Sequence, residues 1–150
     1  MNDIEFERIY DMFADDVWRV CVCYFGSCVA DSEDASQTTF VKLLTNPPGT
    51  DDMQHIKAWL IVTAGNVCKD MLRSRHRRNI PLDSLAEIGY TDAAHDDSVL
   101  RAVLKLPAKV KTAVYLHYYE GMSGEEIAEL CGVKAKIADG FGVLRRVGKE

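Results

Sequence analysis

Apolar residues recur every three or four positions along most of this chain, and this spacing restricts its fold more than any other feature. An α-helix completes a turn in 3.6 residues, so such spacing places one side of a helix against a core. The first stripe ends at Gly26 and consists of Phe6, Ile9, Tyr10, Phe13, Val17, Val20 and Tyr24. Because strand signals are nearly absent, the pattern predicts an all-α protein.

Two further helices are predicted in the first half. One is capped by Asp31, places Phe40 in the core and runs to about Thr45, where Asn46-Pro47-Pro48-Gly49 stops it. The next helix has an apolar face and then becomes basic. That face consists of Ile56, Trp59, Leu60, Thr63, Val67 and Met71.

The second half predicts another group of helices. Val99, Val103 and Leu106 form a short stripe, Pro107 opens the next helix, and Gly121 ends it. Ser123 and Glu126 have the spacing of a capping box, in which each side chain accepts a hydrogen bond from the other's backbone. Ile127, Ala128 and Leu130 should face inward, and Gly132 precedes a final helix from about Lys134. Two short helices joined by a glycine turn are typical of a DNA-binding helix-turn-helix.

The net charge of −5 is distributed unevenly and hides two basic segments. Residues 1–50 hold 3 basic and 9 acidic side chains, whereas residues 51–78 hold 6 basic and 3 acidic ones. Residues 79–98 hold 5 acidic side chains and no Lys or Arg, and residues 99–150 hold 9 basic and 6 acidic ones. This alternation permits a nucleic-acid partner that the average charge would argue against.

Other classes of protein have little support. No apolar run approaches the roughly 18–20 residues that span a bilayer, so we expect no membrane insertion. Five cysteines without framework spacing indicate a reduced, cytoplasmic setting. Cys21, Cys23 and Cys28 invite a zinc interpretation, but small buried side chains fit them better, because Cys-x-Cys on a helix points its thiols to different faces. No catalytic constellation is evident, so we predict no enzyme and no metal site.

Three segments resemble bacterial RNA polymerase sigma factors of the extracytoplasmic-function (ECF) group. Residues 33–42, Glu-Asp-Ala-Ser-Gln-Thr-Thr-Phe-Val-Lys, resemble the acidic-Gln-Phe signature of the second conserved region. Lys57-Ala58-Trp59-Leu60 with Ala64–Asp70 and the basic run resembles the promoter-melting helix. Leu106–Lys109 and Tyr118–Leu130 resemble the fourth region. The segments occur in the family's order and spacing.

The resemblance implies a sigma region 2-like three-helix domain at 1–78, an acidic linker at 79–96 and a region 4-like helix-turn-helix domain at 97–150. The first domain would bind core RNA polymerase and open the −10 element of promoter DNA, and the second would read the −35 element. The family acts in the cytoplasm without a cofactor or an enzymatic activity of its own. An anti-sigma factor is a further possible partner.

The resemblance also implies candidate site residues. Those for core polymerase are Glu33, Asp34, Gln37, Thr38 and Lys42. Asn66 and Asp70 would meet the bases of a separated strand, and its phosphates would be held by Lys69, Arg73, Arg75, Arg77 and Arg78. The −35 candidates are Lys134, Lys136, Arg145 and Arg146. A solvated helix face, or cations that favour a helix C-terminus, would be the purely structural alternatives.

The final segment departs from the family. Gly140, Gly142 and Gly148 weaken a helix, Asp139 repels phosphate, and the chain ends at Glu150, sooner than the family's last helix usually does. An alternative hypothesis is therefore a sigma-like polymerase-binding regulator with impaired −35 readout. A stand-alone helix-turn-helix repressor is a third hypothesis, but it gives the segment from Asp34 to Phe40 no role.

Overall fold

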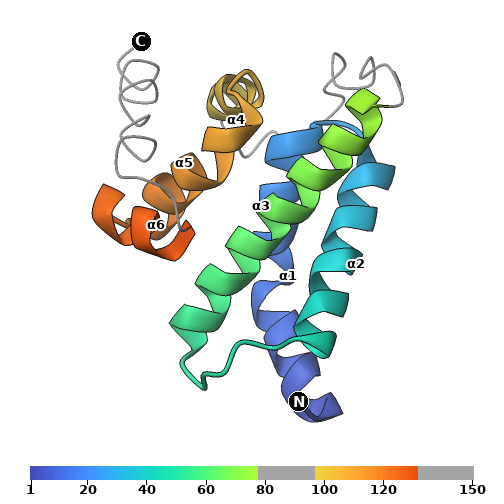
Figure 1. Cartoon of the computed structure of the whole chain (residues 1–150), viewed down its shortest axis with the longest axis vertical. Helices are drawn as coiled ribbons and strands as arrows, with labels where there is room; N and C mark the ends of the chain where they lie inside the picture. Colours follow the sequence, from blue (N-terminus) through green and yellow to red (C-terminus); the bar gives the residue numbers. More distant parts are fainter. Residues whose placement is uncertain (78–96, 132–150) are drawn as a thin grey trace. The chain divides into compact units, whose positions relative to one another are not determined.

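In the computed structural model, the chain is described over residues 1–77 and 97–131. These residues form six helices and no β-strand: α1 (Asp3–Phe25), α2 (Val29–Thr45), α3 (Met53–Arg77), α4 (Asp97–Leu104), α5 (Ala108–Glu120) and α6 (Gly124–Cys131) (Figure 1). They divide into two compact units, one with α1–α3 and one with α4–α6. The all-α prediction is confirmed for the described residues.

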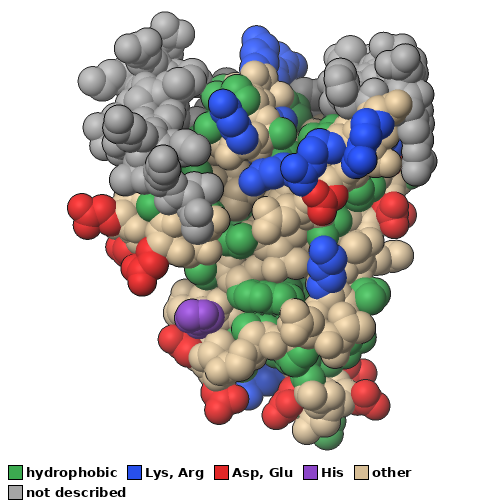
Figure 2. All heavy atoms as spheres, in the orientation of Figure 1, with side chains coloured by type: hydrophobic (Ala, Val, Ile, Leu, Met, Phe, Trp, Pro, Cys, Tyr) green, Lys and Arg blue, Asp and Glu red, His purple; other side chains and the backbone are tan. Residues whose placement is uncertain are grey.

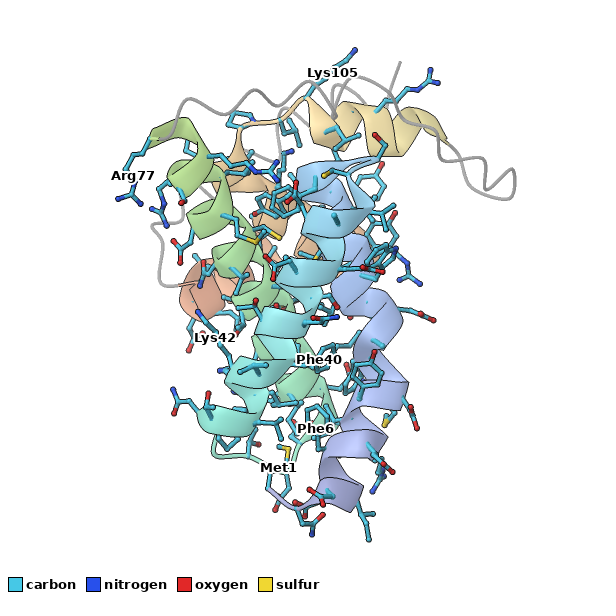
Figure 3. All side chains as sticks on the ribbon, turned by 90° about the vertical axis from the view of Figure 1, so that its right-hand side faces the viewer. Met1, Phe6, Phe40, Lys42, Arg77 and Lys105 are labelled. Atoms are coloured by element: carbon cyan, nitrogen blue, oxygen red, sulfur yellow. The ribbon has the colours of Figure 1, made fainter. Side chains whose placement is uncertain are left out.

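The first unit is a three-helix bundle in which each helix packs against the other two. α1 and α3 start at the end of the bundle that holds the N-terminus, and α2 runs in the opposite direction (Figure 1). Most of the predicted α1 stripe is buried, namely Ile9, Phe13, Val17, Val20 and Tyr24. Phe40 is also buried, as predicted, and its ring meets the Phe6 ring edge-on at a centroid distance of 6.3 Å (Figure 3). Tyr10 is exposed, although its ring lies against Phe40.

The turn from α1 to α2 corrects one prediction. α1 ends before Gly26, as predicted, and the positive φ of 61° at this residue suits glycine. The N-cap of α2 is Cys28, not Asp31, which lies three residues later in the first helical turn. There the Asp31 carboxylate accepts a hydrogen bond from the Cys28 thiol and is favourably placed near the positive end of the helix dipole. The helix therefore begins one turn earlier than the aspartate signal indicated.

Local backbone chemistry sets the connection from α2 to α3. α2 ends at Thr45, as predicted, before Asn46 and the two prolines. The Asp52 side chain then accepts a hydrogen bond from the Gln54 backbone N–H at 3.0 Å, which satisfies one free donor at the start of α3.

In the second unit, α5 packs on α6. Pro107 directly precedes α5, and Gly121 ends it in the left-handed conformation with φ of 66°. The capping box is confirmed: the Glu126 N–H donates to Ser123 Oγ at 3.2 Å, and the Ser123 N–H donates to Glu126 Oε1 at 3.5 Å. Ile127 is fully buried, whereas Ala128 and Leu130 are half-buried.

Two polar side chains reinforce this unit. Lys111 is buried on α5, and its Nζ donates to the backbone oxygen of Leu104 at 3.2 Å, at the C-terminus of α4. A cation suits the negative end of a helix dipole, so this contact joins α4 to α5. The His117 ring lies 2.9 Å from the backbone oxygen of Met122 and ties the end of α5 to the turn before α6.

Candidate binding surfaces

The exposed side of α2 carries four side chains in one line, which we call the α2 ridge: Asp34, Gln37, Val41 and Leu44. Their separations of three, four and three residues place them on one side of a helix. All four are exposed, Val41 to 54% and Leu44 to 48% of their surface. Exposed apolar side chains beside polar ones can form part of a protein-interaction surface.

The other residues predicted for a polymerase contact lie beside this ridge. Glu33 and Lys42 are exposed on α2, outside the line of four. Thr38 is half-buried, and its hydroxyl donates to the backbone oxygen of Asp34 at 2.8 Å. The structure thus places Asp34 and Gln37 on one line of α2 together with Val41 and Leu44. Thr38 instead forms a local hydrogen bond within the helix.

The outer side of α3 carries a second line, which we call the α3 outer face: Trp59, Asn66, Asp70, Arg73 and Arg77. Separations of seven, four, three and four residues place these side chains on one side of the helix. Asn66, Asp70, Arg73 and Arg77 are exposed, and Arg77 projects from the end of α3 (Figure 3). The half-buried Lys69 lies at the edge of this face.

Trp59 corrects the predicted core of α3. It is half-buried, because Ile56, Leu60, Ala64, Val67 and Cys68 fill the centre of the buried side. Met71 and Thr63, also predicted to be buried, are half-buried too. An indole that is partly open to solvent on the same side as Asn66 offers a flat surface on which a nucleic-acid base can stack.

Charged side chains are unevenly distributed along the bundle. Figure 2 shows Lys and Arg side chains over the part of the bundle where α3 ends, and acidic side chains at the end that holds the N-terminus. Asp3, Glu5, Asp51 and Asp52 are exposed at that acidic end.

On the α3 outer face, Arg73 forms an ion pair with Asp70, and both side chains are well exposed. Such an exposed pair is weak, so the Arg73 guanidinium can exchange Asp70 for a phosphate at small cost.

Arg75 behaves differently from its neighbours. Its guanidinium forms an ion pair with Asp31 on α2 and lies over the Phe25 ring, 5.8 Å from the centroid. The structure thus directs Arg75 into the bundle and directs Arg73 and Arg77 to solvent. Arg78, also predicted to bind DNA, lies outside the described residues, as do Lys134, Lys136, Arg145 and Arg146.

The cysteines do not form a metal centre in the described part of the chain. Cys21 and Cys23 are buried, as predicted for small apolar side chains, and Cys28 is half-buried. Across residues 1–77 and 97–131, no group of three His, Cys, Asp or Glu side chains is placed to hold a metal ion. Within the same ranges, no helix combines the length and apolar character required to cross a membrane.

Sequence reasoning did not include the exposed Val41 and Leu44 among the candidate residues, nor did it predict the pairing of Asp31 with Arg75. The signal for the first was available, since Val41 and Leu44 follow Gln37 at helical spacing. No local signal indicated the second, because 44 residues separate Asp31 from Arg75 and only helix packing brings them together.

Comparison with known proteins gives two family matches in the order of the two units. Residues 9–78 match the sigma-70 region 2 model, and residues 96–136 match the sigma-70 region 4 model. The ECF RNA polymerase sigma factor SigW of Bacillus subtilis is 25% identical over 94% of this chain and 87% of its own length. SigL of Mycobacterium tuberculosis is 27% identical over 83% of this chain and 75% of its own length. BldN of Streptomyces coelicolor is 29% identical over 85% of this chain and 52% of its own length. The chain therefore belongs to the ECF group of RNA polymerase sigma factors.

Proposed function

We propose that this protein is an alternative sigma factor that binds core RNA polymerase and directs it to a set of promoters. The observation that carries the proposal is the occurrence of region 2 and region 4 on one chain, in that order. Such a factor acts by binding and strand capture, without a catalytic step or cofactor of its own. It works in the cytoplasm, where polymerase and promoter DNA meet.

The parts of the chain have different tasks in promoter recognition. Residues 1–78 bind polymerase and the −10 element, residues 79–96 link the domains, and residues 97–150 read the −35 element. The region 4 match extends to residue 136 and so includes Lys134 and Lys136, two of the proposed −35 contacts. That match favours promoter reading over the alternative of a regulator with impaired −35 readout.

The α2 ridge is the proposed contact with core polymerase. Asp34 and Gln37 supply hydrogen-bonding groups, and Val41 and Leu44 supply apolar area that a partner can cover. Protein interfaces combine an apolar centre with a polar rim, and this ridge offers both on one helix. Glu33 and Lys42 lie beside the ridge and belong to the proposed rim.

The α3 outer face is the proposed contact with the separated −10 strand. Asn66 can hydrogen-bond to a base edge, and Trp59 offers a stacking surface. Lys69, Arg73 and Arg77 are accessible to phosphates along the same helix. The excess of acidic side chains over the whole chain opposes binding to free duplex DNA, so polymerase is needed to present the promoter.

The test is promoter-dependent transcription with purified core enzyme, combined with a core-polymerase pull-down. Asp34→Ala, Gln37→Ala and Leu44→Ala should weaken the pull-down, whereas Glu7→Ala on the exposed acidic side of α1 should not. The intact chain should also support initiation on a matched promoter that has both elements. Absence of core binding at low micromolar protein would overturn the proposal. Core binding without promoter-dependent initiation would favour the regulator instead. An anti-sigma factor should block core binding, promoter-dependent initiation or both.

A further inference from the structure

A small polar cluster joins the end of α3 to the start of α2. The Asp31 carboxylate forms an ion pair with the Arg75 guanidinium and accepts a hydrogen bond from the Cys28 thiol at 2.7 Å, and both donors reach the same oxygen, Oδ2. The Arg75 guanidinium also lies over the Phe25 ring at the end of α1. One arginine therefore contacts residues at the ends of both other helices of the bundle. We call Asp31, Arg75 and Cys28 the α2–α3 clamp.

The clamp is much less accessible than the other charged pair of α3. The side chains of Arg75 and Asp31 are 21% and 14% exposed to solvent, whereas those of Arg73 and Asp70 are 67% and 61% exposed. A partly buried ion pair with further hydrogen bonds is held more firmly than an exposed one. Removal of one partner leaves the other charge unpaired and poorly solvated, which is costly. Release of Arg75 to a phosphate is correspondingly costly.

Helix geometry separates Arg75 from the proposed DNA contacts. Side chains two positions apart on an α-helix are about 200° apart around its axis. Arg75 therefore lies on nearly the opposite side of α3 from both Arg73 and Arg77. Arg73 and Arg77 share the α3 outer face with Asn66, while Arg75 points toward α1 and α2. A strand that follows the outer face does not meet the Arg75 guanidinium.

We infer that Arg75 is a positioning residue for promoter opening and not a phosphate contact. By holding the last turns of α3 against the start of α2, the clamp fixes the direction in which Arg73 and Arg77 project. The inference rests on the proposed function of α3 and revises the role that the basic run indicates for one of its arginines. It also gives Asp31 a role at a distance from polymerase and DNA.

The two roles of Arg75 predict opposite results for Asp31. If Arg75 positions α3, Asp31→Ala and Arg75→Ala break the same contact and impair strand binding alike. If Arg75 binds phosphate, Asp31→Ala removes a competing carboxylate and leaves strand binding unchanged or stronger. A phosphate contact also carries a salt signature, because each one lost makes the slope of log K against log salt less negative by about 0.7 for single strands.

The experiment measures the affinity of the reconstituted holoenzyme for a single-stranded oligonucleotide with the −10 element of a promoter that it transcribes, at several salt concentrations. Arg75→Ala, Asp31→Ala and the double variant should each lose affinity by about 10-fold, the scale of one hydrogen bond to a charged group, with an unchanged salt slope. The double variant should lose no more than either single variant. The exchange Asp31→Arg with Arg75→Asp should restore part of the loss. Arg77→Ala is the matched arginine control and should change the slope.

General destabilisation is tested separately with Leu43→Val, a core truncation at the far end of α2. At a temperature where every variant is folded and binds core polymerase, Leu43→Val should keep its strand affinity. Equal loss in that variant would overturn the positioning role, as would a reduced slope in Arg75→Ala or undiminished affinity in Asp31→Ala. If the unaltered holoenzyme does not bind the strand at all, the proposed function itself fails, which is a result distinct from these.

Discussion

Truncation of Ile127 to alanine should destabilise the second unit while the first keeps its stability. Ile127 is fully buried on α6, the helix that packs on α5. Replacement of a buried isoleucine by alanine costs about 2–5 kcal/mol, since the cavity that remains collapses only in part. A unit of about 60 residues has a free energy of unfolding of about 3–9 kcal/mol, so the substitution removes a large share of it.

The aromatic residues allow the two units to be followed separately. Both tryptophans, Trp18 and Trp59, lie in the first unit, so tryptophan fluorescence reports the unfolding of α1–α3. Far-UV circular dichroism reports all helices. In guanidinium chloride, Ile127→Ala should move part of the dichroism transition to lower denaturant while the fluorescence transition stays in place.

The matched control is Glu129→Ala, an exposed position on the same helix, which should change neither transition. Parallel movement of the fluorescence transition in Ile127→Ala would show that the two units unfold as one, contrary to the reasoning from separate cores. An unchanged dichroism transition would show that the burial of Ile127 contributes little to the stability of α5 and α6.

Four further predictions follow from single contacts. Ser123→Ala removes the N-cap of α6 and should lower the free energy of unfolding of the second unit by about 1 kcal/mol, measured by circular dichroism in guanidinium chloride. Gly121→Ala should cost about 1–2 kcal/mol in the same assay, because an added Cβ meets no atom within 4 Å and the cost comes only from the positive φ of 66°; no change would refute the left-handed turn. Arg77→Ala should make the salt slope of −10 strand binding by the holoenzyme less negative by about 0.7. Leu44→Lys should weaken core-polymerase binding about tenfold with no loss of melting temperature, because a cation suits the last turn of α2, and a parallel fall in both would place Leu44 in the core instead.

Features that depend on neighbours in sequence were predictable. α1, α2 and α5 end at Phe25, Thr45 and Glu120, directly before turn or breaker residues whose effect is local. The capping box between Ser123 and Glu126 spans three residues and forms as predicted. Asp31 was a misleading signal, because an aspartate also suits the first turn of a helix and the capping preference does not distinguish these positions.

The sequence by itself determined the helical class, the order of the two family regions and the uneven distribution of charge. These depend on residue spacing and composition, which every helix carries within its own segment. Only the tertiary structure decided which side of each helix is covered. Trp59 lies at the edge of the surface that α3 buries against the bundle and is therefore half-buried. The packing of α1, α2 and α3 directs Arg75 inward to Asp31, while Arg77 stays in solvent. The physical reason is that burial and ion pairing depend on distances between residues far apart in the chain, which the spacing within one helix does not specify.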